Sequence, residues 1–178
     1  MTEDQQKAVK SETRLAIALN VVISAFFAWL VFPKTGEIAM WGASGMAFDL
    51  LPTTFMILFM TTLALSLVTR RRIKAGAIAP LDLEDAPNGF SGLAAKRLPR
   101  NIPLRAVTLA VGACLALIPF LVGALTLVGA ASMNFPTFAA FKMAYGAFLG
   151  LVFTPIILLS AMASTAREVA GVAQTPSS

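Results

Sequence analysis

Four long apolar runs divide the chain, at residues 15–32, 50–68, 106–133 and 143–163, and none of them contains a charged side chain. A helix needs about 20 residues to cross the hydrocarbon core of a bilayer. The runs do not alternate apolar with polar residues, as the strands of a membrane barrel do. The pattern therefore predicts an all-α integral membrane protein with four transmembrane helices, at about residues 15–32, 50–68, 106–131 and 143–163.

The composition agrees with this prediction. Of the 178 residues, 57% are hydrophobic and 13% are charged, whereas a soluble domain is about 45–50% apolar and about 25% charged. Three cations, Lys7, Lys10 and Arg14, precede the first run, as positive residues precede the apolar core of a signal peptide. That run is longer than a signal-peptide core and a second run follows soon after it, so we expect an uncleaved first helix.

The 14 lysines and arginines are distributed unevenly. Three precede the first run, eight lie between the second and third, and Arg167 follows the fourth; Lys34 and Lys142 fall in the other two connections. Positive residues accumulate on the cytoplasmic side of membrane helices. We therefore expect both termini to be cytoplasmic, in a cell membrane that we take to be a bacterial inner membrane. The expected order is a cytoplasmic segment (1–14), a transmembrane hairpin (15–68), a basic cytoplasmic loop (69–105), a second hairpin (106–163) and a cytoplasmic tail (164–178).

The outer boundary of the predicted spans is marked by Trp29, Trp41 and Tyr145, whose amphipathic rings prefer membrane interfaces. Lys142 maps to the same level, one residue before the fourth run. We expect Lys142 to extend its ammonium into water as an interfacial anchor; the alternative is a buried functional charge that faces a cavity. Residues 134–136 are typical of a turn, and we expect the next few residues to lie along the interface.

The central loop carries the whole net charge of +5, because the charges elsewhere balance. Each basic residue beside an anionic membrane contributes about 1 kcal/mol of attraction. The loop's basic residues are therefore candidate contacts for anionic lipid head groups: Arg70, Arg71, Arg72, Lys74, Lys96, Arg97, Arg100 and Arg105. Specific binding of one head group, or of an acidic protein, is the alternative to this general electrostatic role.

Other features of the loop predict little regular structure. We expect Gly76 to end the second helix, and Pro99 and Pro103 to limit any further helix to a turn or two. The acidic residues in "DLED", at 82–85, form a solvated turn more readily than a metal site, because the spacing of a calcium-binding loop is absent.

Polar residues inside the runs recur at helical spacing. Asn20 and Ser24 share one face of the first span, and Thr62 and Ser66 share one face of the second. This predicts a hydrogen bond between these two helices, with a polar binding site as the second interpretation.

Small residues predict a close helix contact. Gly146 and Gly150 form a GxxxG motif, which lets another backbone approach. A short loop joins the third and fourth spans, so we expect the partner to be Gly123 and the neighbouring alanines of the third span. A contact between two copies of the chain is the alternative.

Pro119 and Pro155 lie near the middle of the third and fourth runs. Each removes a backbone donor and frees a carbonyl where no water is present. Together with Thr154 they define a possible midplane ligand site between these two helices. Kinks in well-packed helices are the other interpretation. If the midplane ligand site exists, its pocket would be lined by Phe120, Phe148 and Phe153.

The chain contains no histidine and one cysteine, Cys114. This excludes His-ligated haem, the commonest zinc sites and Ser-His-Asp catalysis, and we expect no enzyme activity, no cofactor and no metal. Expected partners are anionic lipids at the cytoplasmic face, and another copy of the chain or a membrane protein; nucleic acid is not expected. Two functions fit: a non-catalytic subunit or accessory component of a membrane assembly, or a small permease or lipophile-binding protein that uses the site between the third and fourth helices.

Overall fold

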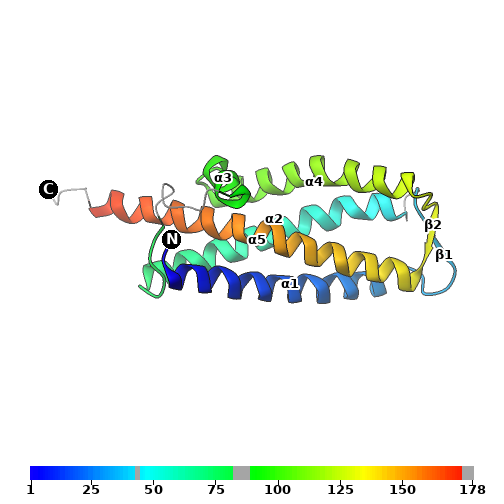
Figure 1. Ribbon diagram of the computed structural model, residues 1–178, viewed down its shortest axis with the longest axis horizontal. Coiled ribbons are helices and arrows are strands. Elements are labelled where there is room, and N and C mark those ends of the chain that lie inside the picture. Colours follow the sequence, from blue (N-terminus) through cyan, green and yellow to red (C-terminus); the bar gives the residue numbers. More distant parts are fainter. Residues whose placement is uncertain (43–44, 82–88, 174–178) are drawn as a thin grey trace.

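The computed structural model describes residues 1–42, 45–81 and 89–173, with side chains as far as residue 165. Four long helices run along the molecule (Figure 1): α1 (Glu3–Val31), α2 (Met46–Lys74), α4 (Ile102–Leu127) and α5 (Phe135–Ala173). All four are long and apolar enough to cross a membrane, which confirms the predicted number of membrane-length helices. A short helix, α3 (Phe90–Arg97), lies at the same end of the bundle as the N-terminus, and we name this the α3 end.

The opposite end, which we name the ribbon end, carries two short antiparallel strands, β1 (Glu37–Ala39) and β2 (Ser132–Asn134). They lie in the connections between α1 and α2 and between α4 and α5, so these connections meet in a small ribbon that the all-α prediction omitted. Ile38 of the ribbon is buried in one apolar cluster with Phe32, Met40, Met46 and Phe138.

A capping box places the start of α1 earlier than predicted. The Thr2 hydroxyl accepts a hydrogen bond from the backbone N–H of Gln5, and the Gln5 side chain accepts one from the N–H of Thr2. This reciprocal arrangement satisfies two donors that a helix start leaves unpaired. As a result, the segment expected to precede the first span is part of the same helix from Glu3 onward.

The start of α5 also differs from the prediction. Asn134 Oδ1 accepts a hydrogen bond of 3.0 Å from the backbone N–H of Thr137, as an N-cap side chain does. Pro136 then falls in the first turn, where a helix tolerates proline. The predicted turn at 134–136 was therefore wrong, and the residues after it form the first turns of α5 rather than an interfacial segment.

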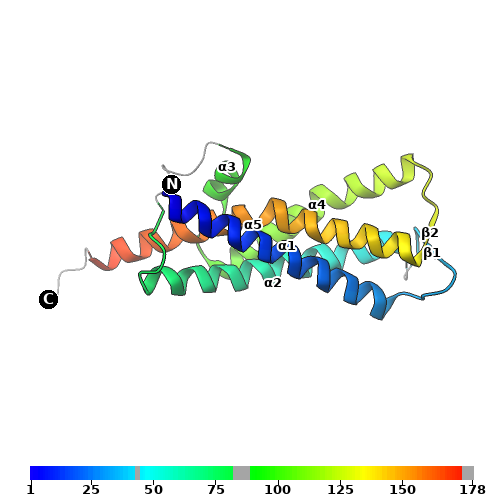
Figure 2. The same ribbon diagram turned by 60° about the horizontal axis from the view of Figure 1, so that its bottom comes forward.

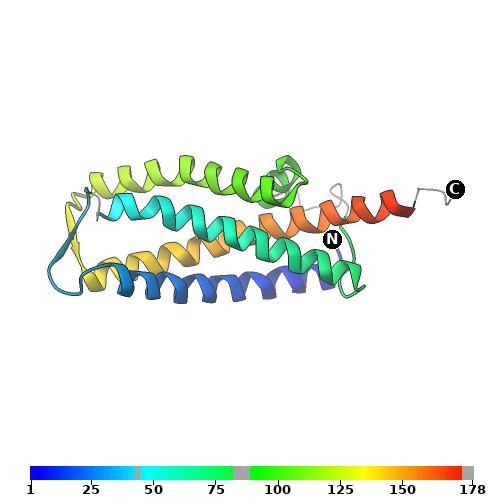
Figure 3. The same ribbon diagram turned by 180° about the vertical axis from the view of Figure 1, so that it is seen from behind.

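α5 is the central helix. It packs against α1, α2 and α3, while α2 also packs against α4. Figures 1 and 3 show α1 and α4 at opposite edges of the bundle, with α2 and α5 between them. Figure 2 shows α4 diverging from α5 toward the ribbon end. Helices consecutive in the chain are thus not the main packing pairs, and the interior is built around α5.

The GxxxG motif of α5 meets α1 and not α4. A Cβ added at Gly146 would overlap Ser24 Oγ and lie 2.8 Å from the Asn20 carbonyl oxygen. One at Gly150 would lie 3.1 Å from Ile17 Cα. Gly123 has open space where its Cβ would be, so the predicted pairing of these glycines with the third span was wrong.

Glycine also ends α2, as predicted. The helix ends at Lys74, and Gly76 follows with φ of +72°, a left-handed conformation that favours glycine. Among the described residues of the loop after it, α3 is a short helix of eight residues, or about two turns, close to the limit expected from its prolines.

Candidate functional site

An ion pair joins α2 to α5 inside the bundle. The ammonium of Lys142 lies 2.7 Å from one carboxylate oxygen of Asp49 and donates a hydrogen bond of 3.0 Å to the other. Lys142 is only 2% exposed, so the prediction of an anchor with its ammonium in water was wrong. The alternative interpretation, a buried charge, describes this residue.

Two aromatic rings and a hydroxyl fix the pair in place. Asp49 lies in the first turn of α2, where the helix dipole stabilises a carboxylate, and Thr53 donates a hydrogen bond of 3.3 Å to it. The rings of Phe32 and Phe138 have their centroids 5.3 Å and 5.8 Å from Lys142 Nζ, within range of a cation–π attraction. The ammonium is therefore held by one carboxylate and shielded by two rings.

A second polar contact joins the same two helices one turn deeper. The hydroxyls of Thr54 and Tyr145 lie 2.6 Å apart. Thr54 donates its proton to the carbonyl of Leu50 at 2.6 Å, so Tyr145 is the donor between the two hydroxyls. Tyr145 is buried inside the bundle, whereas Trp29 and Trp41, the other two aromatic residues assigned to the outer boundary, are exposed.

A groove of about 540 Å³ opens between α1 and α2, with the ion pair at its ribbon end. A second space of about 210 Å³ continues it toward the α3 end. Ligand sites in proteins enclose about 300–1,000 Å³ and combine apolar walls with a few polar groups. The groove has this size and character. Its apolar walls are formed by Ile23, Phe27, Val31, Pro52, Met56, Ile57 and Met60.

The α1 wall of the groove also carries two polar side chains, Asn20 and Ser24. No hydrogen bond within the described part of the chain joins them to Thr62 or Ser66, so the predicted bond between α1 and α2 was wrong. Ser66 instead accepts a hydrogen bond from Arg105, and the hydroxyls of Ser24 and Thr62 are buried without a partner. Asn20 thus adds an amide to the otherwise apolar α1 wall of the groove.

The proposed midplane site is not assembled as the sequence suggested. Pro119 lies on the exposed side of α4, and Phe120 beside it is 72% exposed. Thr154 is fully buried on α5, and Pro155 follows it in a half-buried position. The structure therefore does not bring Pro119 together with Thr154 around a shared space.

The basic residues at the α3 end fall into two groups. Most are exposed, as lipid-contacting side chains would be: Arg71, Arg72, Lys74, Lys96, Arg97 and Arg100. Arg70 is half-buried, and Arg105 is only 1% exposed. The expectation that Arg105 lies on the membrane surface was wrong.

No three His, Cys, Asp or Glu side chains gather in a metal-binding arrangement among residues 1–42, 45–81 and 89–165. The "DLED" stretch, at residues 82–85, lies outside the described residues. Cys114 is a free thiol on α4 that lies 3.8 Å from the carbonyl oxygen of Leu51.

Comparisons with protein-family models, curated proteins and solved structures found no match to this chain. Sequence reasoning missed the ion pair because it placed Lys142 outside the fourth span. One signal was available in the charges of the side assigned as outer. There the cations Lys34 and Lys142 are balanced by two anions, one of which, Asp49, adjoins the start of the second run.

Proposed function

We propose that this chain is a non-catalytic membrane protein that binds an amphiphile in the groove between α1 and α2. The observation that carries the proposal is the Asp49–Lys142 ion pair at the end of an apolar groove of about 540 Å³. Ionisable residues inside membrane helices are costly, and they usually mark a functional site. This site replaces the one expected between the third and fourth helices.

The chemistry of the groove defines the class of ligand. Apolar side chains along α1 and α2 suit an acyl or other hydrocarbon chain. The ion pair is neutral overall, so a head group that is itself neutral or zwitterionic fits it best. An ammonium on the ligand would approach Asp49 and a phosphate would approach Lys142. The Asn20 amide can bond to an ester or hydroxyl group part of the way along the chain.

We also propose that the protein spans a bacterial inner membrane with both termini in the cytoplasm. The excess of lysine and arginine before the first span and between the second and third supports this orientation. The N-terminus and α3 lie at one end of the bundle (Figure 1), as this topology requires. The ion pair would then lie in the outer half of the membrane, and the groove would open to lipid.

A second function, as an accessory subunit of a membrane assembly, is supported by the length of the same groove. The two spaces share Asn20, Ile23, Met60 and Thr61 and so form one furrow along both helices. A helix of a partner protein is the other occupant that such a furrow accommodates. The two functions differ in what fills it.

One experiment separates them. The full-length protein is purified in mild detergent and its bound molecules are identified by native mass spectrometry. Thr61 lines both spaces, so Thr61→Phe should fill the furrow at its centre. Thr108→Phe is the matched control, because Thr108 is exposed on α4 and lines neither space.

The proposal predicts an amphiphile that is retained by the unaltered protein and by Thr108→Phe, and lost from Thr61→Phe. A protein partner lost from Thr61→Phe instead would support the accessory function. An amphiphile bound equally by all three proteins would contradict the groove as its site.

A further inference from the structure

A second buried cation lies at the α3 end, at the opposite end of the bundle from the ion pair. Arg105 is in the first turns of α4 and is 1% exposed. Its Nη1 donates hydrogen bonds to the Ser160 carbonyl at 3.0 Å and to Ser164 Oγ at 3.1 Å, and its Nη2 donates one to Ser66 Oγ at 2.8 Å. All three acceptors are neutral, so the side-chain bonds that hold this guanidinium leave its charge uncompensated.

Part of the donor capacity of Arg105 is also unused. A guanidinium has five N–H donors in a planar fork, and the three bonds above occupy three of them. Nε is buried and has no hydrogen-bond partner. A buried donor left without an acceptor destabilises the folded chain, and a buried charge without a counter-ion does so more strongly. One anionic ligand that accepted hydrogen bonds from the unused donors of Arg105 would remove both defects.

The start of α4 supplies a second, independent preference for an anion. The cap residue, Asn101, makes no side-chain hydrogen bond to the helix. The N–H groups of Ile102 and Leu104 therefore lack a capping side chain, Pro103 between them has no N–H, and the helix dipole adds partial positive charge at the same point. Such helix starts bind phosphate groups. Asn101 and Ile102 line the same cavity as Arg105.

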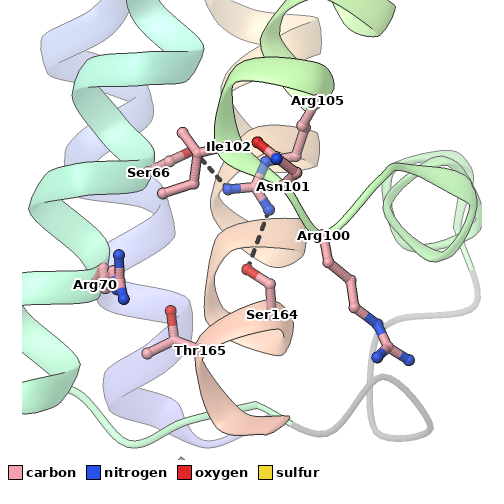
Figure 4. Close-up of a pocket in the computed structure, with 8 residues that line it drawn as sticks. All are labelled: Ser66, Arg70, Arg100, Asn101, Ile102, Arg105, Ser164 and Thr165. Atoms are coloured by element: carbon pink, nitrogen blue, oxygen red, sulfur yellow. Dashed lines mark hydrogen bonds between the residues drawn. The ribbon is translucent and has the colours of Figure 1, made fainter. Parts of the chain in front are cut away.

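The cavity itself is polar and has a volume of about 440 Å³. Figure 4 shows the guanidinium of Arg105 reaching from α4 between Ser66 of α2 and Ser164 of α5. Arg100 also lines the cavity, and its side chain extends away from Arg105 in this view. A smaller space of about 220 Å³ adjoins it and shares Arg100 and Ser164. No carboxylate lines either space among the described residues.

We propose that this cavity binds a phosphate group. Arg105 would supply buried N–H donors to the phosphate, and the start of α4 would contribute backbone N–H groups. Arg100 would cover the exposed side of the cavity. A planar arginine fork matches two oxygens of a phosphate at once. The ligand is a phosphate ester, either the head group of an anionic lipid or a soluble molecule, and the experiment distinguishes these sources.

The test uses the full-length protein in nanodiscs of phosphatidylcholine. Its midpoint of thermal unfolding is followed while phosphatidylglycerol is added to the bilayer, or while glycerol 3-phosphate is added to the solution, and the rise gives an apparent Kd for each probe. The test variants are Arg105→Lys, which keeps the charge but loses the fork, and Arg100→Gln. Arg97→Gln is the matched control, because Arg97 is exposed nearby and lines neither cavity.

We expect at least one probe to bind saturably, and Arg100→Gln and Arg105→Lys to weaken it about tenfold or more, as the loss of a charge-assisted hydrogen bond does. Arg97→Gln should change the Kd less than twofold. Binding of phosphatidylglycerol alone identifies a lipid source, and binding of glycerol 3-phosphate identifies a soluble one.

Two results would overturn the proposal. One is that neither probe raises the midpoint. The other is that Arg97→Gln weakens binding as much as Arg100→Gln, which indicates diffuse surface attraction. Should Arg105→Lys fail to fold, the comparison of Arg100→Gln with Arg97→Gln decides the matter.

Discussion

Lys142 and Asp49 are 93 residues apart in the chain, and their charged groups meet at 2.7 Å inside the bundle. This contact fastens the start of α2 to α5 at the ribbon end of the groove. It also puts a permanent dipole where the helices are otherwise apolar. The proposed binding function depends on this pair, and so does the stability of the α2–α5 contact.

Removing one member of the pair should destabilise the protein more than removing both. Asp49→Asn leaves the Lys142 ammonium buried without a counter-ion, which costs about 3 kcal/mol or more in the free energy of unfolding. The double variant Asp49→Asn/Lys142→Met replaces the pair by neutral groups of similar size and should recover most of that loss. The free energies of unfolding of the single and the double variant are measured in mixed micelles. Equal losses in the single and the double variant would show that the pair is not coupled.

Alanine in the GxxxG motif should separate α1 from α5. Gly146→Ala would force its Cβ into Ser24 and the Asn20 backbone, and such overpacking costs roughly 1–3 kcal/mol. Gly123→Ala is the control, because open space surrounds that position; alanine there should be neutral or stabilising by up to about 1 kcal/mol. Thermal unfolding of the two variants is compared. A larger loss from Gly123→Ala would contradict the observed helix pairing.

The hydrogen bond between Tyr145 and Thr54 should contribute measurably to stability. Tyr145→Phe keeps the ring and removes the donor, with an expected loss of about 1 kcal/mol. Thr54→Val removes the acceptor, and a double-mutant cycle isolates the coupling between the two hydroxyls. The two losses should not add, because both variants remove the same bond. Fully additive losses would mean that the 2.6 Å contact contributes nothing.

The proposed topology predicts opposite outcomes for two reporter fusions. A phosphatase that is active only outside the cytoplasm should be inactive when fused after residue 178, and active when fused after Gly42 in the α1–α2 connection. Activities of the two fusions in intact cells are the measurement. The reverse pattern would place the ion pair in the cytoplasmic half of the membrane.

The helices were predictable from the sequence because their signals are local. Each apolar run identifies a membrane-length helix by its length alone, and Gly76 ends α2 with the left-handed conformation expected of it. The start of α5 was missed although its signal is also local: Asn134 followed two residues later by Pro136 is an N-cap pattern. It was interpreted as a turn.

The helix pairings were not predictable in the same way. Gly146 and Gly150 indicate a close helix contact but do not identify the other helix. The short loop before α5 suggested α4 as the partner, whereas the partner is α1. The partner of Lys142 lies 93 residues away, and the acceptors of Arg105 come from α2 and α5. Such long-range polar contacts depend on how four similar apolar helices pack. Local patterns in a single sequence do not reveal that packing.

Photolabelling identifies which residues an amphiphile touches, and so tests whether one occupies the groove between α1 and α2. Phosphatidylethanolamine with a diazirine in one acyl chain is incorporated with the full-length protein into nanodiscs, irradiated, and the labelled residues are mapped by mass spectrometry. We expect labels concentrated on groove residues such as Phe27, Met56 and Met60, and we expect these labels to be lost in Thr61→Phe but not in Thr108→Phe. Labels spread evenly over the lipid-facing side chains of α4, unchanged by Thr61→Phe, would contradict it.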